Sequence, residues 1–128
     1  MRPLDEGETL ARFARDSGHF KGGRPRWKLF EPARIDNSTS VFRTEGLGEP
    51  EIWQLGDVHA TVDGRQPVAR AELTPRDVSE VSLSIEADDS PPRHAAIVGW
   101  PDRKDALMER MRELASALAS RAVLRIRA

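Results

Sequence analysis

The chain has 128 residues, a formal net charge of −1 and no cysteine. This length fits one domain, and the missing cysteines exclude disulfide bridges and thiolate metal sites. The near-neutral charge excludes a molecule that is basic as a whole, although arginine supplies 17 of the 20 cationic side chains. We therefore expect a single domain over residues 1–128 that is stabilised by packing alone.

Nothing in the sequence has the pattern of a targeting or membrane segment. Residues 1–9 are polar and acidic, whereas a secretory signal has a basic start followed by an apolar region. No apolar run approaches the roughly 20 residues that cross a bilayer. These features predict a cytoplasmic protein with no membrane partner.

The first third of the chain predicts a short helix, a loop and two strands. Apolar residues have helical spacing between Gly7 and Gly18, and they are Leu10, Phe13 and Ala14. The segment 19–28 is rich in glycine and cations, which predicts a loop that leads into a short strand over 27–30. Strand-forming residues after an Asn-Ser turn then predict a strand over 39–44.

The middle of the chain predicts a helix and three strands. Proline is tolerated in the first turn of a helix, which favours a helix over 50–60. We expect strands over 68–73, 81–87 and 94–100, with one helical turn over 74–79 capped by its threonine. Segments 81–87 and 94–100 should pair as an antiparallel hairpin, with the apolar 94–100 in the middle of the sheet.

The C-terminal part has the clearest helical periodicity. Apolar residues recur over 102–119, where Trp100 or Asp102 is the expected cap. They include Leu107, Met111, Leu114 and Leu118. A last strand over 122–127 should return to the sheet, with Ala122, Leu124 and Ile126 facing inward. This order predicts an α+β fold: a mixed or mostly antiparallel sheet of about five strands, with helices 102–119 and 50–60 laid on one face.

Known sequence signatures of catalysis are missing. The chain has no phosphate-binding glycine loop, no dinucleotide fingerprint and no nucleophile elbow. Its three histidines, His19, His59 and His94, are isolated and lack the spacing of metal ligands. We therefore expect no cofactor and no metal, and the balance of features leans away from an enzyme.

His94 is the first candidate for a functional side chain. It begins the predicted strand 94–100, directly after Pro91-Pro92-Arg93. Chemistry is often placed where strands meet loops, and a histidine there can act as a general base or bind an anion. The alternative is a structural histidine that hydrogen-bonds the end of the strand.

Arg43 lies on the predicted strand 39–44. An arginine that points inward from a strand needs a carboxylate partner, and Glu51 is a candidate on the following helix, close to Trp53. Arg43 then either holds a substrate or forms a structural ion pair, and we favour the ion pair. Trp100 poses a similar choice, because its ring either wedges between helix and sheet or offers a platform on which a ligand stacks.

The basic segment is the remaining candidate. Phe20 and Trp27 alternate there with four cations, Lys21, Arg24, Arg26 and Lys28. Cations with aromatic rings can bind single-stranded nucleic acid through phosphate contacts and base stacking. The alternative is a solvated loop whose two aromatic side chains pack into the core.

Three stretches together resemble a group of small bacterial proteins of about 130–140 residues that carry no assigned function. They are SVFRTEGL over 40–47, EIWQLG over 51–56 and RHAAIVGWP over 93–101, followed by Lys104. The resemblance covers roughly residues 10–124 and implies a bacterial origin and a free-standing domain. If these motifs mark a ligand-binding site, its residues are Arg43, Glu51, Trp53, His94 and Trp100.

Three functions follow from these features. The first is a non-enzymatic binding or accessory protein, whose partner is another protein or a second copy of the chain. The second is single-stranded nucleic-acid binding through residues 19–34. The third is a small hydrolase or transferase that uses His94 with Arg43 or Glu51, which requires these groups to meet in one cleft.

Overall fold

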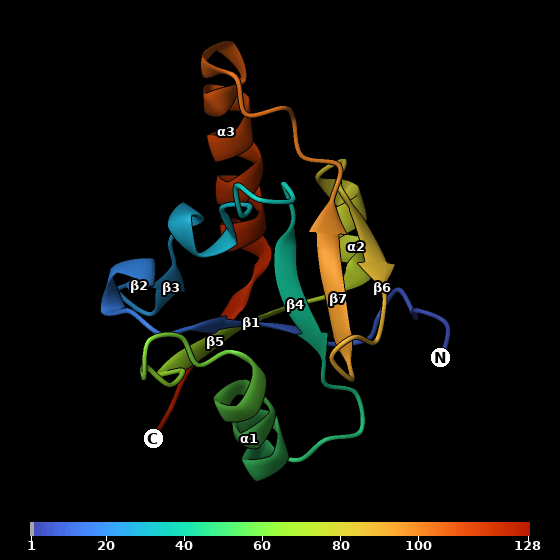
Figure 1. Cartoon of the computed structure of the whole chain (residues 1–128), viewed down its shortest axis with the longest axis vertical. Helices are drawn as coiled ribbons and strands as arrows, with labels where there is room; N and C mark the ends of the chain where they lie inside the picture. Colours follow the sequence, from blue (N-terminus) through green and yellow to red (C-terminus); the bar gives the residue numbers. More distant parts are fainter. Residues whose placement is uncertain (1) are drawn as a thin grey trace.

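The computed structural model describes residues 2–128, apart from the side chains of residues 105 and 106. Six strands form the main sheet: β1 Leu10–Ala14, β4 Thr39–Arg43, β5 Ala69–Leu73, β6 Ser84–Ala87, β7 His94–Val98 and β8 Val123–Ile126. All neighbouring pairs are antiparallel, in the order β6-β7-β4-β1-β5-β8 (Figure 1). Two short strands, β2 Phe20–Lys21 and β3 Arg24–Pro25, form a separate hairpin.

The helices are α1 Glu49–His59, α2 Pro75–Glu80 and α3 Asp105–Arg121, with 3₁₀ turns η1 Ser17–His19 and η2 Trp27–Phe30. The α+β prediction is confirmed, with six strands in the main sheet in place of about five. The predicted hairpin of 81–87 with 94–100 is confirmed as β6 and β7, and the C-terminal helix is present. As the sequence suggested, Thr74 caps α2 by accepting a hydrogen bond from the Asp77 amide.

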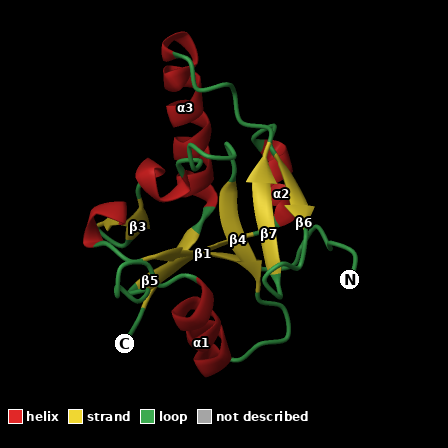
Figure 2. Cartoon of the chain, in the orientation of Figure 1, coloured by secondary structure: helices red, strands yellow, loops and turns green. Residues whose placement is uncertain are grey.

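The expectation that both long helices lie on one face is wrong. Strands β1 and β5 run between α3 and α1 (Figure 2). The α3 side holds the larger core, in which Met111 and Leu118 pack with strand residues such as Ile97. The α1 side holds a smaller core of Ala11, Phe13, Phe42 and Ile52. A three-layer arrangement results, so the sheet has apolar contacts on both faces.

The N-terminal helix predicted between Gly7 and Gly18 is wrong, because this segment forms strand β1. Leu10 and Ala14 face the α3 side, whereas Ala11 and Phe13 face the α1 side. A strand buried on both faces loses the two-residue alternation that identifies half-buried strands. Its apolar residues then fall by chance at helical spacing.

The strand predicted over 27–30 is instead the 3₁₀ turn η2. The amides of Leu29 and Glu31 donate to the carbonyls of Arg26 and Lys28, which is the three-residue spacing of this turn. The turn buries Leu29 and Phe30 together against the α3-side core.

Helix α3 begins at Asp105 after an N-cap at Lys104, so the predicted caps at Trp100 and Asp102 are wrong. The Trp100 indole N–H donates to the Ile97 carbonyl, and the Asn37 amide donates to the carbonyls of Trp100 and Pro101. These bonds hold the segment between β7 and α3 in an extended conformation, so the helix begins later in the chain than predicted.

Three strand details also differ from the expectation. Strand β6 starts at Ser84, because the amides of Val81 and Leu83 donate back to the Val78 carbonyl at the end of α2. Strand β7 is an inner strand next to the edge of the sheet. On the edge strand β8, Ile126 is 56% exposed and does not face the core as predicted.

Helix α1 packs closely against the sheet at Gly56. A Cβ atom at this position would lie 2.7 Å from the Cε1 atom of Phe13, which is itself buried. Alanine is favoured over glycine inside a helix by about 1 kcal/mol, but overpacking a buried ring costs about 1–3 kcal/mol. We expect Gly56→Ala to lower the free energy of unfolding in urea, and Phe13→Leu to relieve the loss in the double variant. A Gly56→Ala protein that is more stable than the wild type would contradict this contact.

Candidate functional site

His94 lies in a chain of three hydrogen-bonded side chains on the α1 side of the sheet. Its Nδ1 atom is 2.7 Å from Asp88 Oδ1, and its Nε2 atom is 3.1 Å from Ser40 Oγ. The bond to His94 is the main cause that lowers the pKa of Asp88 below its usual value. The order carboxylate, imidazole and hydroxyl is that of a nucleophilic serine site.

Strand register produces this chain. Residue Ala87 lies opposite Ala95, so the next residue, Asp88, comes to lie beside His94 across the β6–β7 hairpin. On the other side of β7, Phe42 lies opposite His94, and Ser40 is two residues earlier on the same face of β4. Diagonal neighbours in an antiparallel pair are within reach of a long side chain. The three side chains therefore come from β4, β7 and the loop after β6.

A pocket of about 320 Å³ opens at this place on the α1 side. Ser40 and His94 line it, together with Arg12, Arg15 and His59. The Phe42 ring lies between the two histidines, stacked on His59 at 5.9 Å and edge-on to His94 at 5.5 Å. We call this hollow the histidine pocket.

Arg12 and Arg15 bring positive charge to the histidine pocket. Strands β1 and β4 pair at only two positions and then separate, and Arg12 fills the gap. Its Nε and Nη1 atoms donate to the carbonyls of Leu29 and Ser40, at 2.8 and 2.9 Å. Arg15 Nη1 donates to the Ala60 carbonyl at 3.0 Å.

Among the residues that the structure describes, neither of these arginines has an acidic partner. No carboxylate of the residues that the structure describes lies within 4.0 Å of either guanidinium. Burial, and secondarily the charge of Arg15, lowers the pKa of Arg12 to about 10. An anion in the pocket would offset both the burial of the Arg12 guanidinium and its repulsion by Arg15.

Arg43 and Glu51 do not join His94. Arg43 follows Phe42 on β4, so its side chain leaves the opposite face of the sheet. Its partner is Glu8, at 2.7 Å, in place of the expected Glu51. The Glu51 carboxylate accepts a hydrogen bond from the Gly48 amide at the start of α1. The ion-pair interpretation of Arg43 therefore holds with another acid, and the proposed grouping of His94 with Arg43 or Glu51 is not formed.

The two tryptophan candidates lie elsewhere. The guanidinium groups of Arg70 and Arg127 both lie over the Trp53 ring, at 4.8 and 5.1 Å from its centre. Trp100 is 6% exposed, so its ring is a wedge in the α3-side core and offers no open face. Of the five residues suggested by the resembling motifs, His94 alone lines the histidine pocket.

A hollow of about 670 Å³ beside α1 and the β5–β8 edge contains charges that neutralise one another. Buried Arg70 pairs there with Glu49 and Glu72, and Arg125 pairs with Glu72 at 3.0 Å. Ion pairs satisfied in this way have little remaining capacity for a charged ligand, so this hollow is a weaker candidate site.

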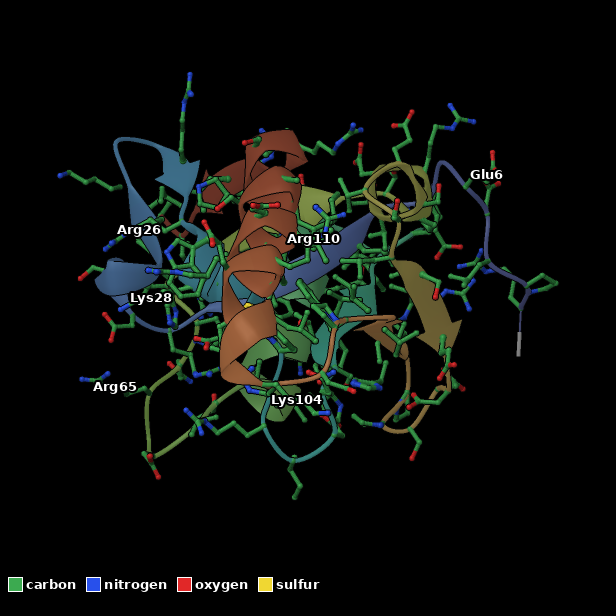
Figure 3. The ribbon with its side chains drawn as sticks, turned by 90° about the horizontal axis from the view of Figure 1, so that it is seen from above. Glu6, Arg26, Lys28, Arg65, Lys104 and Arg110 are labelled. Carbon is green, nitrogen blue, oxygen red and sulfur yellow. The ribbon has the colours of Figure 1, made fainter. Side chains whose placement is uncertain are left out.

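A second region of unsatisfied positive charge surrounds the β2–β3 hairpin. We call the side chains of Lys21, Arg24, Arg26 and Lys28 the basic face. Arg26 and Lys28 lie on the same side of the molecule as Arg65, away from Glu6 (Figure 3). Every Lys and Arg in residues 12–34 lacks a carboxylate within 4.0 Å, considering only described side chains.

His19 connects the basic face with the histidine pocket. Burial lowers the pKa of His19, and the charges of Arg12, Arg15 and Lys28 add to this effect, whereas Asp16 opposes it. Its Nδ1 atom is buried and has no hydrogen-bond partner within the described part of the chain. His19 therefore senses cations of both regions, Lys28 of the basic face and the two arginines of the histidine pocket.

The aromatic side chains of this region are largely occupied. Phe20 and Trp27 pack against the α3-side core, and Arg112 covers the Trp27 ring at 4.5 Å. A pocket of about 500 Å³ remains beside Trp27, between Arg24 and the serines at positions 116 and 120 of α3. Neither ring offers an open face on which a base could stack, and the pocket beside Trp27 is the remaining place for one.

Comparison with known proteins gives no match: no family model, no curated protein and no solved structure matches the chain. Within residues 2–128, no helix is long and apolar enough to cross a membrane. The described side chains also include no group of three or more His, Asp or Glu placed to hold a metal ion.

Four residues of the histidine pocket region were missed in the sequence: Arg12, Arg15, Ser40 and Asp88. The predicted hairpin of 81–87 with 94–100 contained the signal for Asp88, since continuing its register by one residue places Asp88 opposite His94. No comparable local signal marks Ser40, which reaches His94 only through the long-range pairing of β4 with β7.

Proposed function

We propose that this chain binds single-stranded nucleic acid through the basic face, with Arg12 and Arg15 extending the contact. The observation that carries the proposal is the complete lack of acidic partners for the seven cations of residues 12–34 among the described side chains. Ten of the other thirteen lysines and arginines have such a partner. The proposal takes up the second of the three functions that the sequence suggested, in place of the accessory protein with a protein partner that it favoured first.

The distribution of charge supports a polyanionic partner. Residues 12–34 carry seven cations and two acids, a formal charge of +5, so the rest of the chain carries −6. A charge contrast of this size is hidden by the overall value of −1. Phosphate groups along a strand can neutralise such a row of cations and release their own counterions.

The side pocket next to Trp27 supports a single strand in preference to a duplex. Its walls combine the Arg24 side chain, the accessible part of Trp27 and the hydroxyl groups of Ser116 and Ser120. An unpaired base can turn into such a hollow while its phosphate stays on the basic face, whereas a paired base cannot. Because the rings are mostly covered, we expect phosphate contacts to dominate and sequence preference to be weak.

The test is fluorescence anisotropy with a labelled 20-nucleotide deoxythymidine strand over a series of salt concentrations. Replacing Lys21, Arg24, Arg26 and Lys28 together by glutamine should weaken binding at least tenfold at low salt. It should also reduce the slope of log affinity against log salt by about 2–3, because each phosphate contact contributes about 0.7 for single strands.

The control is Arg76→Gln with Arg110→Gln, since these exposed arginines already pair with Glu6 and Glu113. This double variant should bind like the wild type. Wild-type binding that does not respond to salt, or that survives loss of the basic face, would exclude the proposal. Equal or tighter binding of a 20-base-pair duplex would overturn its single-strand part.

A further inference from the structure

The chain Asp88–His94–Ser40 has the connectivity that activates a serine hydroxyl. With the proton of the imidazole on Nδ1, His94 donates to Asp88 Oδ1 at 2.7 Å, and Nε2 is free to accept the Ser40 hydroxyl at 3.1 Å. Both distances lie in the range for productive proton transfer. The His94 side chain is 14% exposed, so packing and two hydrogen bonds hold its ring in place.

Ser40 is accessible to a substrate. It is exposed on β4 and lines the histidine pocket, whereas the carboxylate of Asp88 lies outside that pocket, behind His94. The hydroxyl therefore faces the hollow, and the acid faces the far side of the imidazole. This is the spatial division of roles between nucleophile, base and orienting group.

The remaining charges indicate the substrate class. Arg12 Nη1 donates to the Ser40 carbonyl at 2.9 Å, which fixes a guanidinium next to the hydroxyl-bearing residue. Arg15 lines the same hollow, and neither has an acidic partner among the described residues. A substrate that carries a negative charge on its acyl part would pair with them, and the same cations would stabilise an oxyanion that forms near Ser40.

We propose that Ser40, His94 and Asp88 form a hydrolytic site that cleaves small esters whose acyl group bears a negative charge. This activity goes beyond nucleic-acid binding and does not depend on it. Ser40 is the nucleophile and His94 the general base; both touch the reacting atoms. Asp88 is a positioning residue that acts through His94.

The reaction balances with water as the second reactant. Ser40 Oγ attacks the carbonyl carbon while His94 Nε2 takes the hydroxyl proton. The bond to the leaving alcohol breaks, and His94 returns the proton to that alcohol, which leaves the acyl group on Ser40. Water then attacks the acyl-serine with His94 as base, the proton passes to Ser40 Oγ, and the carboxylic acid departs.

The first test is covalent labelling with a fluorophosphonate probe followed by peptide mass spectrometry. We expect the adduct on Ser40, none on the Ser40→Ala protein, and wild-type labelling of Ser84→Ala. Ser84 is a matched control because it is exposed on β6, the strand on the other side of β7, and makes no side-chain hydrogen bond within the described structure. Labelling at another residue, or no labelling, would overturn the proposal.

The second test is hydrolysis of 4-nitrophenyl hydrogen succinate against the neutral 4-nitrophenyl butyrate. We expect at least a tenfold higher kcat/KM for the charged ester, and at least a tenfold drop in kcat for Ser40→Ala and His94→Gln. Asp88→Asn should lower kcat and leave KM unchanged, because Asp88 does not line the pocket. Hydrolysis that persists in Ser40→Ala would show that the imidazole alone reacts and would contradict the role of Ser40 as the nucleophile.

The same measurements separate this activity from the proposed binding function. The four glutamines that remove the basic face should leave ester hydrolysis intact, and Ser40→Ala should leave strand binding intact. Ser40 is exposed, so its replacement by alanine is expected to change stability by no more than about 0.5 kcal/mol. A loss of activity in that variant is then chemical and not a loss of the fold.

Discussion

Replacing Glu8 by glutamine is expected to lower the free energy of unfolding by about 3–5 kcal/mol, because it leaves a buried cation without its counter-charge. Glu8 is 3% exposed and Arg43 5% exposed. The guanidinium donates to Glu8 Oε1 at 2.7 Å and to Oε2 at 3.0 Å, and two further N–H groups donate to the carbonyls of Arg2 and Pro3. Urea unfolding at pH 7 gives the measurement.

The dependence of this loss on pH identifies its cause. Burial raises the pKa of Glu8, but hydrogen bonds from Arg43, the Asp5 amide and Arg2 outweigh it and lower the pKa from 4.5 to about 2. A folded-state pKa below the unfolded value stabilises the protein above the unfolded pKa, and this contribution disappears as the pH falls. The stability difference between wild type and Glu8→Gln should therefore shrink between about pH 4.5 and pH 2.

A matched control is Glu6→Gln, whose ion pair with Arg76 is exposed on both sides. Exposed pairs contribute about 0–1 kcal/mol, so this variant should unfold almost like the wild type. Similar losses for Glu6→Gln and Glu8→Gln, or a loss for Glu8→Gln that does not change with pH, would contradict the account of the buried pair.

Replacing Leu118 by alanine is expected to cost about 2–5 kcal/mol of the free energy of unfolding, the range for buried large-to-small changes. Leu118 is fully buried in the core between α3 and the sheet, where the surrounding strand residues include several alanines. Small side chains cannot extend to fill the space left behind, so the cavity should persist. Urea unfolding is again the measurement.

Leu107 provides the comparison within the same helix. It is 37% exposed, near the first turn of α3, although helical spacing grouped it with Leu118. We expect Leu107→Ala to cost less than about 1 kcal/mol. Equal losses for the two variants would mean that both ends of α3 are held by the core alike, against the burial seen here.

Helix α3 and strand β6 were predicted well because each has one side that faces the core and one that faces solvent. Their apolar residues recur at helical and at two-residue spacing, and both formed at nearly the expected places. Strand β1 was misassigned because helices cover both of its faces, so no alternation remained to identify it. The spacing of apolar residues identifies an element only when one of its sides is exposed, and it fails where both sides are buried.

The candidate site was predictable only as far as local pairing reaches. His94 was identified because it stands at a strand end, and Asp88 is its neighbour across a short hairpin. Ser40 comes from a strand 54 residues earlier in the chain, and its partner depends on the strand order of the whole sheet. The partner of Arg43 could not be predicted for the same reason, because Glu8 is 35 residues away and meets Arg43 only in the folded chain.

The seven cations of residues 12–34, which have no carboxylate within 4.0 Å among the described side chains, give this segment a formal charge of +5 against −6 for the rest of the chain. In the proposed binding mode, this local charge attracts a strand of phosphates to the hairpin before contact at low ionic strength, and it favours encounters that begin there. Salt should consequently slow the arrival of the partner as well as hasten its departure, although the molecule as a whole carries almost no charge.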